Sequence, residues 1–186
     1  MNSSNISQRS GHMHTKVIII DDDKFQMGHY KRALSAANFA PILVPTTSGV
    51  MPIVSGKAHR DASFFIVDMM MPPGDLYSDE ATECGAYTGL FISRDLRNRF
   101  PVTPILLWTS AHLDSIRAAG KRHAATISNC RYAAKASVSP DDLVCELSYW
   151  LKKGRFRPRL LKVLWRAVGL GTRALAVAAD VKGIRS

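Results

Sequence analysis

Aspartates stand at the ends of two short apolar runs of the sequence. Residues 17–20 run directly into Asp21 and Asp22, and residues 64–67 run into Asp68. Carboxylates gathered at one place repel each other, and a hard divalent cation relieves that repulsion. Oxygen ligands without His or Cys nearby are typical of Mg²⁺, which keeps several of its waters and shares carboxylates with a phosphate. The three aspartates therefore predict a Mg²⁺ site that handles phosphate.

Two more polar residues follow apolar runs further along the chain. Thr109 comes after residues 104–108, and Lys135 comes after the shorter run 131–134. A hydroxyl and a mobile ammonium beside an acidic pocket are suited to moving a phosphoryl group onto a carboxylate. Asp68 is then the nucleophile, and Lys135 absorbs negative charge in the transition state. The alternative, that the aspartates only cap helices after strands, is disfavoured because the hydroxyl and the ammonium stand at matching positions.

The apolar runs and the segments between them predict the elements that hold these side chains. Strands are expected at residues 17–20, 41–44, 64–67, 104–108 and 131–134, and helices at 23–37, 48–59, 89–100, 113–123 and 140–153. Strands that alternate with helices favour a doubly wound α/β fold with a five-stranded parallel sheet and helices on both faces. Ligands of such open sheets bind beyond the carboxyl ends of the strands, where the polar residues stand.

Four short motifs, in order along the chain, resemble those of one protein family. KVIIIDDD is similar to its first strand, FFIVDMMMP to its third, PILLWTSA to its fourth and YAAK to its fifth. Over residues 15–153 the chain thus resembles the receiver domain of two-component response regulators. The resemblance implies a flavodoxin-like sheet with strand order 2-1-3-4-5. It also implies that Asp68 is the phosphorylated residue and that Asp21, Asp22, Asp68 and the backbone carbonyl of Met70 bind Mg²⁺.

Other positions take their roles from the same resemblance. Thr109 is implied as a switch hydroxyl, and Lys135 as the residue that contacts the phosphoryl group. Tyr132, three residues before the lysine, is implied as an aromatic rotamer switch, although an aromatic residue in an edge strand often simply packs. Met70 and Ala111 stand where side chains influence how water reaches an acyl phosphate, and both are apolar here.

The chain departs from the family pattern in two further places. Ala136 follows the lysine, where the family usually has proline. Residues 74–88 form an acidic insertion beside the phosphorylation site, and it bears Asp75, Asp79, Glu80 and Glu83. Such a loop is expected either to select the kinase or to influence the bound ion.

The composition indicates one domain with extensions. The 186 residues are 46% hydrophobic and 22% charged, which is an ordinary globular mixture. Residues 1–14 form a flexible polar leader without the apolar core of a signal peptide. The chain also contains no run of about 20 apolar residues, the length that is needed to cross a bilayer. A cytoplasmic protein is therefore expected. The three cysteines are odd in number and lack metal-ligand spacing, which disfavours disulfides.

The segment 154–186 is a strongly basic tail. From residue 152 onward ten Lys and Arg stand against one acid, Asp180, so this part carries +9 of the formal net charge of +10. Apolar residues at helical spacing over residues 158–168 predict a basic amphipathic helix. Its role stays open between packing on the domain or on a second copy in a homodimer, binding nucleic acid or an anionic membrane, and disorder.

These observations predict a phosphorylation switch. The protein is expected to accept a phosphoryl group on Asp68 from a histidine kinase or phosphotransfer protein in an Mg²⁺-dependent phosphorelay, and to control a downstream protein partner by changing conformation. It is not expected to be an enzyme, apart from slow self-catalysed dephosphorylation. One alternative is a degenerate, phosphorylation-independent scaffold whose tail binds nucleic acid, a membrane surface or a protein. An aspartyl-phosphate phosphatase is disfavoured, because Met70 stands where such enzymes typically carry a second acid.

Overall fold

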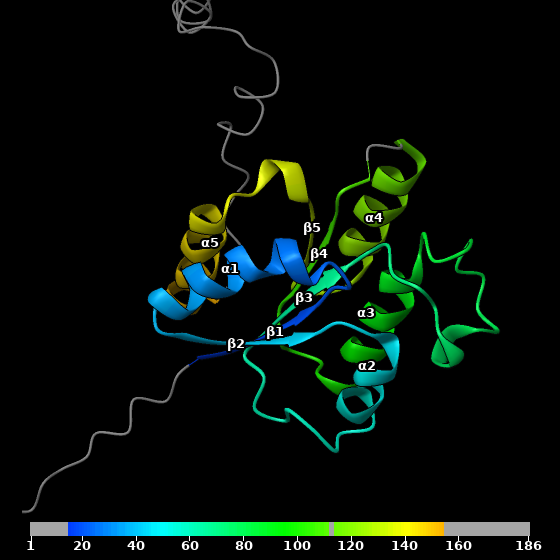
Figure 1. Cartoon of the computed structure of the whole chain (residues 1–186), viewed down its shortest axis with the longest axis horizontal. Coiled ribbons are helices and arrows are strands. Elements are labelled where there is room, and N and C mark those ends of the chain that lie inside the picture. The colour runs from blue at the N-terminus through cyan, green and yellow to red at the C-terminus, as the bar shows by residue number, and fades with distance from the viewer. Residues whose placement is uncertain (1–14, 112–113, 155–186) are drawn as a thin grey trace, which may run out of the picture.

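The computed structural model describes residues 15–111 and 114–154, which form a parallel sheet with helices on both faces (Figure 1). The strands are β1 (Thr15–Ile20), β2 (Phe39–Val44), β3 (Phe64–Asp68), β4 (Ile105–Thr109) and β5 (Cys130–Ala134). The helices are α1 (Lys24–Ala36), α2 (Thr47–Val54), α3 (Thr88–Arg99), α4 (Asp114–Thr126) and α5 (Pro140–Lys153), with 3₁₀ turns η1 (Asp75–Tyr77) and η2 (Lys135–Ser137). The five strands lie in the order β2-β1-β3-β4-β5, so the predicted fold class and strand order are confirmed.

The inner strands β1, β3 and β4 are rich in Ile, Val, Leu and Phe, and every residue of β3 and β4 is buried. Such runs suit a sheet that is covered on both faces, because successive side chains enter opposite layers. All neighbouring strands pair in parallel. The carboxyl ends of the strands therefore meet at one edge of the sheet, where the polar residues of the sequence follow.

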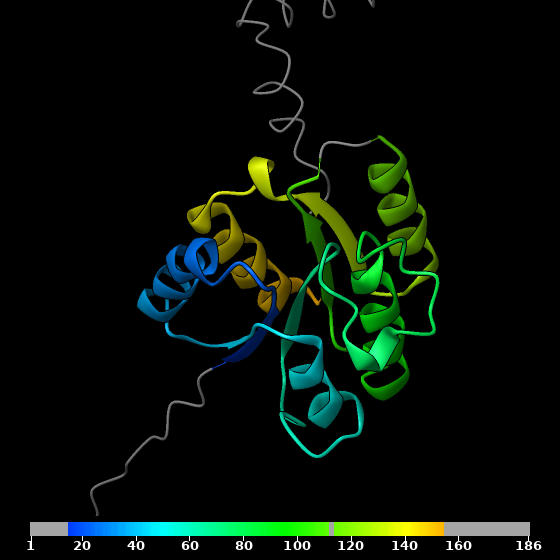
Figure 2. The same ribbon diagram turned by 45° about the vertical axis from the view of Figure 1, so that its right-hand side comes forward.

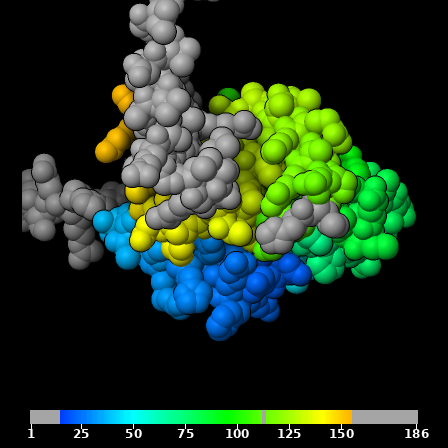
Figure 3. All heavy atoms as spheres, turned by 90° about the horizontal axis from the view of Figure 1, so that it is seen from above, coloured from blue at the N-terminus to red at the C-terminus, as the bar shows by residue number. Residues whose placement is uncertain are grey.

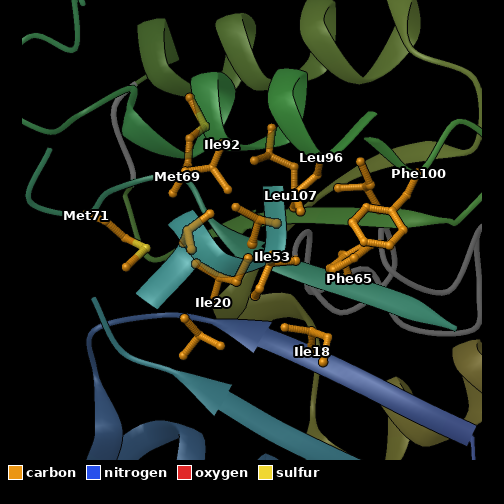
Figure 4. Packing of buried hydrophobic residues seen from close by; sticks show 14 of the residues in the cluster. Ile18, Ile20, Ile53, Phe65, Met69, Met71, Ile92, Leu96, Phe100 and Leu107 are labelled. Carbon is orange, nitrogen blue, oxygen red and sulfur yellow. The ribbon is translucent and has the colours of Figure 1, made fainter. Parts of the chain in front are cut away.

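The helices form two layers that stay apart in both views of the ribbon. Helices α1 and α5 lie together on one face, and α2, α3 and α4 lie on the other, as Figure 2 also shows. The second layer buries the larger apolar cluster, in which Ile20, Phe65 and Leu107 of the strands meet Ile53 and Ile92 of the helices (Figure 4). The first layer packs on the alternate side chains of the same strands, which include Ile19, Ile66 and Trp108.

Two helices that flank the candidate site begin at polar caps. Asp23 accepts a hydrogen bond from the Gln26 amide at 2.8 Å and so starts α1 directly after β1. Ser139 and Asp142 form a reciprocal capping box at the start of α5. Each cap satisfies backbone N–H groups that the first turn of a helix leaves without partners. The third aspartate of the acidic run therefore has a structural role, which leaves the first two for the site.

The helix expected at residues 48–59 is shorter than predicted. It ends at Val54, and the chain turns at Gly56, whose φ of +70° lies in the left-handed region that favours glycine. The Arg99 side chain packs against this glycine and leaves no space for a Cβ. The prediction was wrong here because it carried the helix through Gly56, whose backbone leaves the helical conformation beside Arg99.

The insertion 74–88 is folded onto the neighbouring helices. Tyr77 of η1 is only 2% exposed and joins the larger apolar cluster. Its hydroxyl donates a hydrogen bond to Asp95 of α3 at 3.2 Å, and Arg94 of α3 forms an ion pair with Glu80 at 2.9 Å. The buried Tyr77 ring, its hydrogen bond to Asp95 and the separate ion pair of Glu80 with Arg94 hold the insertion against α3.

Besides residues 112 and 113, where the predicted helix 113–123 begins, two longer parts of the chain lie outside the described residues: the leader 1–14, and the tail from residue 155 with its predicted basic amphipathic helix. Helix α5 ends where predicted, at Lys153, and is followed by Gly154 in a left-handed conformation. Among the helices of the described residues, none has the length and apolar character needed to span a membrane.

Candidate functional site

Three carboxylates meet at the carboxyl edge of the sheet. Asp21 follows β1 and is fully buried, Asp68 is the last residue of β3 and is 5% exposed, and Asp22 is exposed to solvent. The two strands are neighbours, with Ile20 opposite Val67. One oxygen from each of the three carboxylates lies within 4.8 Å of the others. The structure therefore brings together the three aspartates that the sequence predicted would converge.

Lys135 closes this group from the end of β5. Its ammonium lies 2.7 Å from Asp21 Oδ2 and donates a hydrogen bond of 2.8 Å to Asp68 Oδ2. The side chain is 3% exposed, so both ion pairs are removed from water. Burial lowers the pKa of Lys135, but the charges of Asp68 and Asp21 outweigh that effect and leave its pKa raised. Lys135 is therefore charged at neutral pH.

The two buried carboxylates share this single ammonium, which leaves an excess of negative charge. Burial, followed by the charge of Asp21, raises the pKa of Asp68 to about 6, against the opposing effects of Lys135 and the Met70 amide. Burial also raises the pKa of Asp21, although Lys135 and the Asp23 amide act in the opposite direction. A second positive charge at this place would stabilise both ionised carboxylates.

The donor set fits a hard divalent cation. Buried Asp21 Oδ2 has no hydrogen-bond partner among the described residues, and its close contact is the ion pair with Lys135. Two further carboxylates stand within ligand distance of it, one of them open to solvent. Mg²⁺ prefers one or two carboxylates and keeps several waters, which an exposed Asp22 allows. The Met70 amide orients Asp68 by donating to Oδ1 at 3.2 Å, and the role of the Met70 carbonyl as a ligand stays a prediction.

Thr109 and Tyr132 lie on the opposite face of the sheet from the ion pairs. Thr109 ends β4, is fully buried and accepts a hydrogen bond from the Ala111 amide at 3.2 Å. The Tyr132 ring packs against α4 at Gly120, where it leaves no space for a Cβ. Within the described residues its hydroxyl is buried without a hydrogen-bond partner. The roles of both residues in switching stay predictions.

The start of α3 approaches the end of β3 closely. Gly89 N–H donates a hydrogen bond to the Met69 carbonyl at 3.0 Å, and a Cβ on Gly89 would meet the backbone carbonyl of Asp68. Only glycine lets the helix come this near to the backbone. The end of β3 and the start of α3 are therefore in direct contact behind Asp68.

The insertion contributes no ligand to the carboxylate group. In the described part of the chain, that group consists of Asp21, Asp22 and Asp68 alone. Asp75, Asp79 and Glu83 are exposed, and Glu80 pairs with Arg94 instead. An influence of the insertion on the bound ion is therefore not supported, and kinase selection stays a prediction.

Sequence reasoning overlooked two aromatic residues at the site. The ring of Trp108 lies with its centre 5.7 Å from Lys135 Nζ, and Tyr30 of α1 packs against that ring with centroids 4.9 Å apart. By sequence alone, Trp108 is only a member of the apolar run 104–108, and Tyr30 is only a residue of the predicted helix 23–37. A signal was present, because Trp108 directly precedes the strand-end Thr109 and is the register partner of Asp68. Register partners in parallel strands lie on the same face of a sheet.

Comparisons with known proteins place the fold. Neither a family model nor a curated protein matches the sequence. Among solved structures, the response regulator DrrB, a Thermotoga maritima OmpR/PhoB homologue, matches at 19% identity with a TM-score of 0.57, covering 77% of this chain and 55% of that one. The BeF3-activated DrrB receiver domain matches at 19% identity with a TM-score of 0.55, covering 76% and 100%. A receiver domain from Clostridium thermocellum matches at 17% identity with a TM-score of 0.58, covering 75% and 96%.

The chain has the receiver-domain fold. It spans about half the length of full-length DrrB but nearly all of the two isolated receiver domains. At these identities the likeness establishes the fold, while the roles of individual residues rest on the geometry of the site. The resemblance read from the four sequence motifs is confirmed at the level of the receiver fold.

Proposed function

We propose that this protein is a response regulator receiver in which Asp68 accepts a phosphoryl group. The observation that carries the proposal is the buried Asp68 carboxylate, held 2.8 Å from Lys135 and within 4.8 Å of the oxygens of Asp21 and Asp22. Packing alone does not explain this cluster, because two of its three carboxylates are buried and burying such charges is costly. The arrangement has the nucleophile, the cation ligands and the fixed ammonium that phosphoryl transfer to a carboxylate requires.

The proposed donor is a phosphohistidine on a histidine kinase or phosphotransfer protein. One oxygen of Asp68 bonds to phosphorus while the bond from phosphorus to the donor nitrogen breaks, and the electron pair stays on the imidazole. Lys135 is placed to neutralise charge on the phosphoryl oxygens, and the Met70 amide holds Asp68 Oδ1 in orientation. Asp21, Asp22 and Asp68 would hold Mg²⁺, which would supply further neutralisation of the negative charge on the phosphoryl group.

The phosphorylated form is proposed to act on a downstream protein through the other face of the sheet. The Thr109 hydroxyl accepts from the Ala111 amide, so its proton stays available to an acceptor such as a phosphoryl oxygen. The Tyr132 hydroxyl has no partner among the described residues, so it can change position without breaking a hydrogen bond. The protein is thus a switch whose own chemistry is limited to slow self-catalysed loss of the phosphoryl group.

The test is incubation of the full chain with Mg²⁺ and acetyl phosphate, followed by intact mass. The wild type should gain one phosphoryl group, and Asp68→Asn should gain none. Asp61→Asn is the matched control, because Asp61 is an exposed aspartate that pairs with Lys16 at the start of β1, the opposite end of that strand from Asp21. Labelling of Asp68→Asn to the level of the wild type would overturn the assignment of the phosphoacceptor.

A further inference from the structure

The Lys135 ammonium is in contact with an aromatic ring as well as with carboxylates. Its Nζ stands over the ring of Trp108, 5.7 Å from the centroid. Trp108 is fully buried and is the largest buried side chain of the described residues. The face of an indole ring carries negative electrostatic potential and attracts a cation, most strongly where water is excluded. The ring therefore provides an attractive surface for the ammonium on the face shared with Asp68.

Tyr30 connects this aromatic contact to the backbone that carries Lys135. Its ring meets Trp108 at an interplanar angle of 66°, which is an edge-on arrangement. Its hydroxyl donates a hydrogen bond of 2.7 Å to the carbonyl of Val138. Val138 in turn closes the η2 turn by donating its amide to the Lys135 carbonyl at 3.1 Å. Figure 3 shows this turn, in yellow, next to α1, in blue.

Core packing alone does not explain a tryptophan at position 108. Its indole N–H is buried, and within the described residues it has no hydrogen-bond partner. A buried donor without a partner is destabilising, and a leucine or phenylalanine would fill space without stranding one. The indole adds a ring face that leucine lacks and that attracts a cation more strongly than the phenylalanine ring does, and Lys135 is the cation that stands there.

We propose that Trp108 and Tyr30 are positioning residues for Lys135. Trp108 holds the ammonium at the two carboxylates by attraction to its ring face, and Tyr30 fixes both the ring and the turn from which Lys135 extends. This inference rests on the proposed phosphoryl transfer and adds two residues to it. Their loss affects the step in which Lys135 acts and leaves the Mg²⁺ ligands in place.

The first test compares phosphorylation rates at saturating Mg²⁺ and acetyl phosphate. Trp108→Leu should lower the maximum rate about tenfold, the loss of one desolvated cation–aromatic contact, and Trp108→Phe should keep most of it because an aromatic face remains. The Mg²⁺ concentration for half-maximal rate should not rise. Leu106→Val is the control, because Leu106 is buried in the same cluster and strand, two residues before Trp108. Its rate should match the wild type.

The effect of Trp108→Leu should disappear when Lys135 is already absent. In the Lys135→Met background the further change should leave the rate unaltered, since both substitutions act through one contact. A tenfold loss that persists in this background would show a merely structural role and overturn the proposal, as would a wild-type rate in Trp108→Leu. If Trp108→Leu does not fold, Tyr30→Phe is the alternative, because it removes only the hydroxyl oxygen. It should lower the phosphorylation rate, because the hydrogen bond to Val138 that holds the η2 turn is lost. A wild-type rate in that variant would overturn the role of Tyr30.

A second test is independent of phosphorylation. In a protein with Trp150→Phe and Trp165→Phe, Trp108 is the remaining tryptophan, and its emission reports the charge over its ring. Lys135→Met should shift that emission, whereas Lys16→Met, which removes a lysine paired with Asp61, should not. Unchanged emission in Lys135→Met would overturn the contact itself. If the emission shifts but Asp68 is never phosphorylated, the proposed function fails and the contact stands.

Discussion

The two faces of the sheet differ in what they hold at the carboxyl edge. Towards α1 and α5, Asp68, Trp108 and Lys135 form a group joined by ion pairs and a cation–aromatic contact, here called the charged face. Towards α3 and α4 the group is Thr109 and Tyr132 above the larger apolar cluster, here called the hydroxyl face. On the charged face the polar groups contact each other, whereas the buried hydroxyl groups of the hydroxyl face have few hydrogen-bond partners.

This difference separates two properties that the proposed function requires, a fixed reaction site and a region that can change conformation. The ion pairs of the charged face require one geometry, because a buried charge that loses its partner is costly. On the hydroxyl face, the hydroxyls of Tyr132, Thr88 and Ser93 are buried without hydrogen-bond partners among the described residues. They can therefore be rearranged without breaking bonds. The charged face is suited to chemistry and the hydroxyl face to a change of conformation.

The largest expected effect belongs to the charged face. Lys135→Met should slow phosphorylation by acetyl phosphate by on the order of 100-fold, because it removes a fixed charge from the transition state. The rate is measured by intact mass over time. Lys16→Met, at a half-buried lysine that pairs with exposed Asp61, should react like the wild type. A wild-type rate in Lys135→Met would remove the basis for assigning the chemistry to this face.

The repulsion within the charged face should appear as a pH-dependent loss of stability without Mg²⁺. Asp68 holds its proton up to a pKa of about 6 in the folded protein, against an ordinary value of 3.8. The folded state thus binds more protons between these values, so stability falls as the pH rises through them. Asp68→Asn should be more stable by on the order of 2 kcal/mol well above pH 6, with no gain near pH 3.8.

Urea unfolding at both pH values, with and without Mg²⁺, measures this difference. Excess Mg²⁺ should stabilise the wild type and reduce the advantage of the variant, because the ion binds the folded wild type and Asp68→Asn lacks one of its ligands. An Asp68→Asn protein that is less stable than the wild type well above pH 6 would contradict the excess of negative charge derived for the charged face.

A substitution on the hydroxyl face should lower the free energy of unfolding and leave the phosphorylation rate unchanged. Gly120→Ala places a Cβ against the Tyr132 ring, and the crowding should cost about 1–3 kcal/mol. Gly28→Ala in α1 is the matched control, because its Cβ would meet only Arg32 at an ordinary 3.8 Å. Alanine there should stabilise the helix by roughly 0.5–1 kcal/mol. Unfolding experiments and phosphorylation rates together test whether the two faces are separable.

The smallest effect expected is on the lifetime of the acyl phosphate. Met70 is 40% exposed and Ala111 half-buried, and neither offers a polar group to position water. A protein with Met70→Asn and Ala111→Glu should lose its phosphoryl group faster than the wild type. Decay of the phosphorylated mass after removal of the donor gives both rates. Equal or slower decay in the double variant would show that these two side chains do not control hydrolysis.

Much of the fold could be predicted from local patterns. Five apolar runs alternating with helical segments predicted a parallel sheet, and four of the five ended at a polar residue that the structure places at the carboxyl edge. The helix expected at residues 48–59 failed because its end depends on Gly56 meeting Arg99 of α3, a contact between distant parts of the chain. The anchoring of the insertion by Tyr77 and Asp95 depends on a distant contact in the same way.

The sequence by itself determined which groups meet at the site. Asp21, Asp68 and Lys135 follow strands of one parallel sheet, and parallel strands end at a common edge, so their convergence needs no further information. Only the tertiary structure decided that the lysine is shared by both buried carboxylates and enclosed by Trp108 and Tyr30. Those contacts depend on how α1 and the turn after β5 pack on the sheet. Residues 30, 108 and 135 are too far apart along the chain for any local pattern to relate them.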